Sequence, residues 1–213
     1  MSCDSSASGY SPVLISCLEG LNAAMLARDP HTACHQERVA ILARRLAVRY
    51  GLSAQHAERI RIAGRIHDVG KLTLPMTMLM APRPLSTTET IVLRDHALFG
   101  AQMLRSIGAP EELCETVQSH HERLDGDGYP LGLSGREISI DARIVAVSDV
   151  VDAMLSDRPH RPARRIEDVV AVLERERGLA YDSDVVRCAL EELEDLELQA
   201  RREDLQLTGS VGI

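Results

Sequence analysis

Apolar residues recur at every third or fourth position along most of this chain, the spacing of α-helices that bury one face. No alternation of polar and apolar residues continues for more than a few positions, so no β-sheet is expected. Prolines, glycines and capping residues divide the apolar stripes into consecutive segments. The predicted helices cover residues 12–28, 32–50 and 53–69, open again at Ser86, Pro110 and Asp141, and end with 166–177 and 184–206.

Ionisable residues interrupt these apolar stripes on one helix after another. His35 shares a face with Val39 and Leu42, and His96 shares one with Phe99. A single inward histidine is usually a hydrogen-bonded core residue, but a buried ionisable group is costly unless it is paired or binds a metal. Several such groups directed at one interior therefore predict a shared metal centre. The residues concerned are His35, His67, Asp68, His96, His120, His121 and Asp149.

The chemistry of these side chains narrows the choice of metal. Imidazole and carboxylate ligands without thiolate suit iron, manganese or zinc. Asp68 or Asp149 can bridge two ions about 3.5–4 Å apart, which is the geometry of two-metal phosphoester hydrolysis. The residues thus predict a metal-dependent hydrolase.

Composition limits the class of protein. The 213 residues suit one domain, and its core must be aliphatic because there is no tryptophan and one phenylalanine. No apolar run approaches roughly 18 residues and the first ten residues are polar, so we expect no membrane span and no signal peptide. The cytoplasm is therefore the expected compartment, and five scattered cysteines without a CxxC pair indicate free thiols. The formal charge of −8 argues against a long nucleic acid as partner.

Residues 122–140 form the longest irregular stretch, a functional signal in a compact domain. It follows paired histidines in the segment HHERLDGDGYP, from His120 to Pro130. This segment resembles the signature of the HD-GYP family of cyclic dinucleotide phosphodiesterases, a branch of the HD superfamily. Matching segments are also found at residues 29–39, 67–71, 148–154 and 158–162, so the resemblance covers roughly residues 29 to 190.

The resemblance implies an all-α fold, an HD-superfamily helical bundle around a di- or trinuclear metal centre. It divides the chain into an N-terminal helix over residues 1–28, a nearly stand-alone HD-GYP catalytic domain over 29–190, and a C-terminal helix and tail over 191–213 that pack on the domain or extend it. Two divalent ions, or three, are the expected cofactors, with iron or manganese preferred. The implied ligands are His67, Asp68, His96, His120, His121 and Asp149, with His35 as a further ligand.

The function implied by the resemblance is hydrolysis of cyclic di-GMP to linear pGpG, with GMP as a further product, by attack of a hydroxide that bridges the metals. Asp68 and Lys71 are the expected catalytic residues, and Lys71 would hold a phosphate oxygen. Tyr129 would stack on the nucleotide or hydrogen-bond to it. Arg158 and Arg161 match positions from which the family contacts substrate phosphate or guanine.

Some positions depart from the family pattern or leave two interpretations open. His31 replaces the usual tyrosine or glutamate, and with His35 at i, i+4 it is a candidate ligand for a third ion. Asp152 either orients a metal ligand without binding the metal itself, or it is an acid on the helix surface. The leucines of the last helix either pack on their own domain or bind a second copy or a regulatory protein.

Two other functions stay open at this stage. A catalytically silent receptor or interaction module for cyclic dinucleotides would not need a complete ligand set. An HD-type hydrolase of another phosphoester, such as a different cyclic dinucleotide, would keep the ligands and change the substrate contacts.

Overall fold

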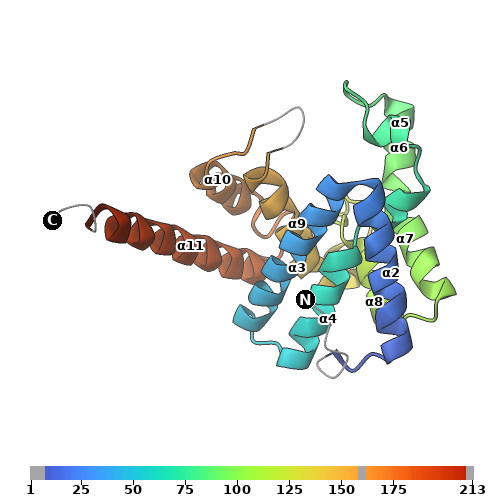
Figure 1. The fold of residues 1–213 in the computed structure, drawn as a ribbon, viewed down its shortest axis with the longest axis horizontal. Coiled ribbons are helices and arrows are strands. Elements are labelled where there is room, and N and C mark those ends of the chain that lie inside the picture. Colours follow the sequence, from blue (N-terminus) through green and yellow to red (C-terminus); the bar gives the residue numbers. More distant parts are fainter. Residues whose placement is uncertain (1–7, 158–161, 210–213) are drawn as a thin grey trace.

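The computed structural model describes residues 8–157 and 162–209, which fold into a bundle of helices (Figure 1). Among these residues no β-strand forms, and one isolated β-bridge joins Arg177 and Tyr181. The predicted all-α fold is therefore confirmed. In chain order the elements are α2 (Pro12–Arg28), α3 (Pro30–Arg49), α4 (Ala54–Ile66), the 3-10 helix η1 (Val69–Thr73), α5 (Met76–Leu79), α6 (Thr87–Arg94), α7 (His96–Ser106), α8 (Glu111–Ser119), the 3-10 helix η2 (Gly135–Glu137), α9 (Ile140–Leu155), α10 (Ile166–Glu176) and α11 (Ser183–Gly209).

The centre of the bundle is the packing of α3 against α4 and α9. A Cβ atom on Gly64 of α4 would lie 3.0 Å from the Cα of Ala40 on α3, so glycine lets the two backbones approach closely. The surrounding core is aliphatic, as predicted, with Leu46 and Ile60 fully buried. Because of this close packing, predicted ligands on two different helices come near each other.

A single residue, Asp29, separates the first two helices. Its backbone N–H donates to the carbonyl of Met25 at the end of α2, and its side chain accepts from the N–H of Thr32 at 3.0 Å. Helix α3 consequently begins at Pro30, two residues before the predicted start. Leu18 of α2 belongs to the same hydrophobic cluster as the core of α3, and the proposed domain boundary at residue 28 stays a prediction.

The segment that opens at Ser86 differs from the prediction. The capping box of Ser86 and Glu89 is present, but α6 ends at Arg94 and a new helix, α7, begins at His96. The break has a local cause. Nδ1 of His96 lies 2.6 Å from the carbonyl oxygen of Leu93, which in a continuous helix would accept a backbone N–H group of the next turn. The prediction of one continuous apolar stripe through His96 was therefore wrong.

Two smaller corrections concern segments beside the site. A short helix, α5, forms within the proline-rich stretch that was expected to be a loop. Helix α9 is capped by Ser139, whose hydroxyl accepts from the N–H of Ala142, and Asp141 lies in its first turn instead of at the cap.

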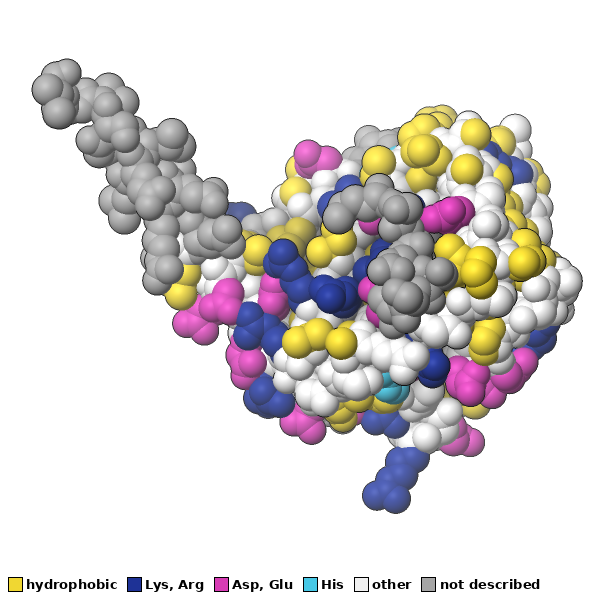
Figure 2. Space-filling view, turned by 60° about the horizontal axis from the view of Figure 1, so that its bottom comes forward, with side chains coloured by type: hydrophobic (Ala, Val, Ile, Leu, Met, Phe, Trp, Pro, Cys, Tyr) yellow, Lys and Arg dark blue, Asp and Glu magenta, His cyan; other side chains and the backbone are white. Residues whose placement is uncertain are grey.

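Helix α11 begins on the bundle and extends away from it (Figure 1). At its base, Arg45 and Arg49 of α3 lie 2.7 Å and 2.8 Å from carboxylate oxygens of Glu192, and Figure 2 shows acidic and basic side chains interspersed in this region. Leu193 is buried here, whereas Leu196 is 39% exposed. None of the helices in residues 8–157 and 162–209 is long and apolar enough to cross a bilayer.

Candidate metal centre

The end of α4 presents the first pair of candidate ligands, His67 and Asp68, both almost fully buried. Nδ1 of His67 lies 2.8 Å from the carbonyl oxygen of Gly64. Since a carbonyl can only accept, Nδ1 carries the proton and Nε2 keeps its lone pair. That Nε2 atom is buried without a hydrogen-bond partner. An unsatisfied buried acceptor of this kind is costly unless a ligand occupies it.

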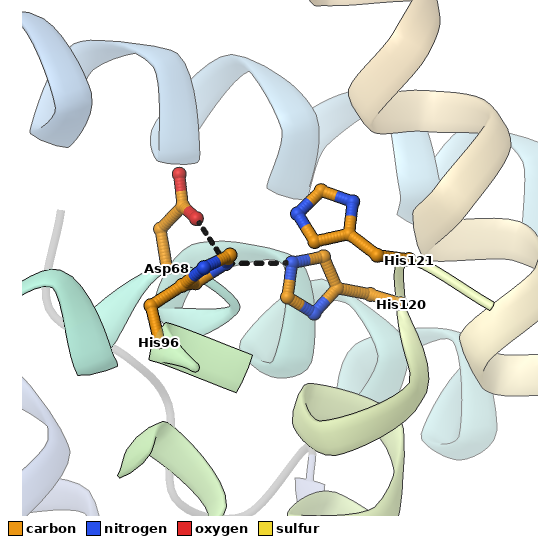
Figure 3. Close-up of side chains that lie close together, drawn as sticks. All are labelled: Asp68, His96, His120 and His121. Carbon is orange, nitrogen blue, oxygen red and sulfur yellow. Dashed lines mark hydrogen bonds and ion pairs between the residues drawn. The ribbon is translucent and has the colours of Figure 1, made fainter. Parts of the chain in front are cut away.

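His96 and His120 repeat this arrangement from two other helices. Their Nδ1 atoms lie 2.6 Å and 2.7 Å from the carbonyls of Leu93 and Val117, three residues earlier in each case. Their Nε2 atoms face each other at 3.4 Å (Figure 3). Two nitrogens that both carry lone pairs are held together favourably only when a cation lies near both. The three histidines therefore have their tautomers fixed by backbone carbonyls three residues earlier, which leaves Nε2 of each ring free to bind a metal.

The carboxylate of Asp68 lies among these imidazoles. One oxygen is 3.1 Å from Nε2 of His96, and the other is 2.6 Å from Nζ of Lys71 and 3.4 Å from Nε2 of His67. Burial by itself raises the pKa of Asp68, but the charge of Lys71 and the neighbouring imidazoles lower that pKa to well below its usual range. Asp68 is consequently a carboxylate at neutral pH.

Asp149 of α9 closes the other side of the cluster. One of its oxygens is 3.0 Å from Nε2 of His35 and 4.0 Å from Nε2 of His67, and the other is 3.9 Å from Nδ1 of His121. Burial raises the pKa of Asp149, but the hydrogen bond from His35 and the nearby imidazoles lower it by more. The structure thus brings two carboxylates and five histidines from different segments of the chain to one place.

The protonation of the last two histidines suits a metal ligand. Burial lowers the pKa of His121 to about 3, although the charge of Asp149 acts in the opposite direction. Burial and the neighbouring imidazoles hold the pKa of His120 well below its usual value. Both rings are neutral at pH 7, which is the form that binds metals.

Among the described residues, six of the seven candidate ligands fall into two sets that share Asp68, and within each set the donor atoms lie within 4.8 Å of one another, whereas Asp149 belongs to neither set. One set is Asp68, His96, His120 and His121, and the other is His35, His67 and Asp68. Imidazoles and ionised carboxylates, with a buried Nε2 of His67 and Oδ1 of Asp68 that lack hydrogen bonds, fit divalent cations. A carboxylate common to both sets is the arrangement expected of a two-metal site.

The loop after α8 is held beside the histidine pair by hydrogen bonds from its backbone to the side chain of Glu122. The buried carboxylate of Glu122 accepts the N–H of Leu131 at 2.7 Å and the N–H of Leu133 at 3.0 Å. A Cβ on Gly128 would lie 2.4 Å from the backbone nitrogen of Arg123, so only glycine fits there. This turn places the ring of Tyr129 at 4.6 Å from the ring of His121.

Two cavities adjoin the cluster. The first, of about 410 Å³, is lined by the predicted ligands His35, Asp68, His96, His120, His121 and Asp149 and by Lys71, Glu122, Arg123, Tyr129 and Tyr181, among others. The second, of about 640 Å³, lies between the start of α3 and the α5–α6 segment and is more apolar. They share the lining residues His35, Lys71 and Leu93, so the two cavities adjoin each other beside the cluster.

Comparison with protein families agrees with this geometry. A family model described as HD domain matches residues 20–185. The chain belongs to the HD domain family. The resemblance to the HD-GYP branch is thereby confirmed, because curated relatives of that branch match over most of the chain.

Three relatives illustrate the match. The HD domain is 35% identical over 205 residues to a cyclic di-GMP phosphodiesterase of Thermotoga maritima, covering 94% of this chain and 56% of that protein. It is 36% identical over 174 residues to the cyclic di-GMP phosphodiesterase response regulator RpfG of Xanthomonas campestris, covering 80% and 46%. It is 35% identical over 156 residues to 3'3'-cGAMP-specific phosphodiesterase 3 of Vibrio cholerae, covering 73% and 34%. The chain thus spans between a third and just over half of the length of these relatives.

Solved structures share the fold. An HDG"Y"P protein of Bdellovibrio bacteriovorus aligns with a TM-score of 0.65 and 16% identity over 86% of this chain and 63% of that chain. The HD domain of the phosphodiesterase PgpH of L. monocytogenes, in complex with cyclic-di-AMP, aligns with a TM-score of 0.63 and 17% identity over 82% and 93%. These similarities confirm an HD-type helical fold for this HD domain.

The HD domain brings the predicted ligands together, and the other predicted site residues differ in where they lie. Lys71 and Tyr129 border the same cavity as the ligands. His31 is exposed, with Nε2 3.1 Å from the carbonyl of Asp157, and belongs to neither set of candidate ligands. Arg158 and Arg161 lie outside the described residues. The roles of all these residues stay predictions.

Sequence reasoning did not assign Glu122 or Arg94 to the site. Glu122 follows the histidine pair directly, and that position is the signal that could have identified it. Arg94 contacts Tyr129 because the fold brings the two residues together, and its guanidinium carbon lies 5.0 Å from the ring centroid. No local pattern predicts a contact between residues that far apart in the chain.

Proposed function

We propose that this HD domain is a metal-dependent phosphodiesterase that hydrolyses cyclic di-GMP to linear pGpG, and pGpG further to GMP. The observation that carries the proposal is that Nε2 of His67 and Nε2 of His96 lie beside the buried carboxylate of Asp68, with Nε2 of His120 facing that of His96 in the same group of possible metal ligands. Nitrogen and oxygen donors that lack protons need cations, and a shared carboxylate suits two of them. Iron or manganese are the proposed metals, with a third ion as a further possibility.

The residues around the cluster would act on the substrate directly. When bound, divalent ions supply Lewis-acid stabilisation of the phosphodiester and lower the pKa of water. Asp68 and Asp149 are ionised and His120 and His121 are neutral, so these four ligands need no proton transfer before they bind a metal. Lys71 borders the cavity and would hold a phosphate oxygen, because its ammonium group lies beside the cluster. Tyr129 would donate a hydrogen bond from its hydroxyl group.

Two observations support a cyclic dinucleotide as the substrate. The relatives from Thermotoga maritima and Xanthomonas campestris are named as cyclic di-GMP phosphodiesterases, and the match covers most of this chain. The two adjoining cavities, which share His35, Lys71 and Leu93, offer space beside the cluster for a ligand with two bases. Guanine recognition by Arg158 and Arg161 remains part of the proposal.

A second substrate is supported by a specific similarity. Three relatives of the chain are named as 3'3'-cGAMP-specific phosphodiesterases of Vibrio cholerae. The mixed guanine–adenine dinucleotide has the same pair of phosphodiesters, so the metal chemistry would be unchanged and only the base contacts would differ.

Metal content and turnover should be measured on one anaerobically purified sample, with cyclic di-GMP and 3'3'-cGAMP as substrates and products separated by chromatography. Two or three ions per chain with release of pGpG or GMP is the expected result. Asp68→Ala should lose both metal and turnover. Bound metal and tight cyclic di-GMP binding without hydrolysis of either dinucleotide would contradict the enzyme and favour a silent receptor.

The cellular compartment, the domain boundaries and the partner of α11 are also proposals. The described cysteines are free thiols, which supports a reducing compartment, and we propose the cytoplasm. The division at residues 28 and 190 and the pairing of α11 with a second copy or a regulatory protein are likewise proposals.

A further inference from the structure

The cations that line the cavity at the candidate metal centre already have carboxylate partners. Nζ of Lys71 lies 2.6 Å from Asp68. The guanidinium of Arg123 lies 2.6 Å from Asp125 and 3.3 Å from Glu176. Among the described lining residues, both cations therefore have carboxylate neighbours, and Lys71 is already assigned by the proposed function to the phosphate at the cluster.

Arg94 is not one of the residues that line this cavity but contacts Tyr129, which does, and it differs from these cations. It is the last residue of α6, its side chain is exposed, and its guanidinium carbon lies 5.0 Å from the centroid of the Tyr129 ring. Within residues 8–157 and 162–209 no carboxylate lies within ion-pair distance of it and it makes no side-chain hydrogen bond. A guanidinium has five N–H donors in a planar fork, and a contact with an aromatic face leaves the donors at its edge free.

The position of Arg94 relates it to the metal centre. Tyr129 contacts Arg94 at 5.0 Å and the ring of His121 at 4.6 Å, so one aromatic ring separates the free guanidinium from a candidate ligand. Two residues after Arg94, the chain turns into α7 at His96, whose Nε2 faces the cluster. The same break between α6 and α7 therefore brings His96 to the cluster and Arg94 to Tyr129.

We propose that Arg94 binds the phosphate of the cyclic dinucleotide that is not being cleaved. The inference rests on the proposed function. A cyclic dinucleotide carries two phosphodiesters in one covalent ring, so when one is at the cluster the other is held a few bonds away. Each keeps a negative charge, which is costly to desolvate without a partner. The fork of an arginine can donate to two phosphate oxygens at once.

Contact with Tyr129 also lowers the cost of this binding. A long exposed arginine loses rotamer freedom when it binds an anion, and packing over an aromatic ring restricts it beforehand. Arg94 would thus select substrates that have a second phosphate. If Arg94 only supported Tyr129, its replacement would change the hydrolysis of every phosphodiester equally.

The test compares two substrates. Cyclic di-GMP has two phosphates, whereas bis(p-nitrophenyl) phosphate is a diester with one. For metal-loaded Arg94→Gln we expect KM for cyclic di-GMP to rise about tenfold, with KM and kcat for bis(p-nitrophenyl) phosphate and the metal content unchanged. Arg94→Lys should recover part of the loss. Arg105→Gln, which removes an arginine of α7 that pairs with Glu111, should behave like the wild type.

The outcomes separate this proposal from the proposed function. Equal losses on both substrates, or unchanged kinetics on both, would overturn the role of Arg94 while wild-type turnover of cyclic di-GMP upheld the function. Absence of both binding and turnover of cyclic dinucleotides by the wild type would contradict the function and the role of Arg94 with it.

Discussion

Nδ1 of His35 lies 2.6 Å from a carboxylate oxygen of Asp152, one turn of α9 beyond Asp149. The same carboxylate accepts two bonds from Arg38, at 2.6 Å and 3.0 Å. The donor to Asp152 is the Nδ1–H group, so Nε2 is directed to Asp149 and the cluster. Of the two interpretations open from sequence, the structure favours the one in which Asp152 orients a candidate ligand, since its side chain is buried.

Removal of the Asp152 carboxylate should weaken metal binding. Asp152→Ala leaves the ring of His35 without its orienting acceptor, and we expect the affinity for manganese to fall roughly 10- to 100-fold. A competition titration with a metal-sensitive dye measures this. Asp195→Ala, which removes an exposed acid from α11, serves as the control. Equal affinities of Asp152→Ala and the wild type would refute the orienting role.

Metal binding should also release a proton from His35. Burial alone lowers the pKa of His35, but hydrogen bonds to Asp149 and Asp152 raise it to about 9 in the metal-free protein. The ring is then protonated at pH 7.5 and must lose that proton to bind a metal, so affinity should rise with pH up to about 9. Because this pKa exceeds the usual 6.5, the protonated ring stabilises the metal-free fold below pH 6.5, and that stability is lost as the pH rises through 9.

Calorimetry of manganese binding in buffers of different ionisation enthalpy counts the released protons. His35→Gln should release about one proton fewer than the wild type at pH 7.5. The same proton count in both proteins would show that His35 is not displaced from its carboxylates when the metal binds.

Local patterns were sufficient to predict much of the bundle and the candidate ligands. Caps such as Ser11 and Ser53 and the apolar stripes identified helices close to the observed α2, α3 and α4. The ligands were predictable because each interrupts an apolar stripe, and a buried ionisable group needs a partner. Such signals depend on residues a few positions apart, which is the range over which sequence patterns are informative.

Features that depend on particular side-chain contacts were not predictable from the apolar pattern in the same way. The break at Asp95 arises because the ring of His96 competes for a backbone carbonyl, and the hydrophobic pattern alone favours a continuous helix. Pairing of Asp152 with Arg38 joins residues on two different helices. The contact of Arg94 with Tyr129 requires the packing of α6 against a loop, which no local spacing specifies.

The loop that carries Tyr129 should depend on the Glu122 carboxylate. Glu122→Ala removes the acceptors of two backbone N–H groups, so we expect faster proteolysis within residues 123–134 and at least tenfold lower turnover, with the metal retained. Limited proteolysis followed by mass spectrometry measures the first effect. Glu115→Ala, an exposed acid of the preceding helix α8, is the matched control. Unchanged cleavage within this loop would contradict the role of Glu122.

Glycine at position 70 should be required for the packing of η1 against α7. A Cβ there would lie 1.9 Å from the carbonyl oxygen of His96 and 2.6 Å from the nitrogen of Gly100, and both are backbone atoms that cannot rotate away. We expect Gly70→Ala to destabilise the metal-free protein by about 1–3 kcal/mol and to weaken metal binding, because α7 carries His96. Gly20, in the middle of α2, has no atom within 4 Å of an added Cβ, so Gly20→Ala should stabilise by about 0.5–1 kcal/mol. Urea unfolding of both variants measures the difference, and a Gly70→Ala protein as stable as Gly20→Ala would show that the two segments can separate without cost.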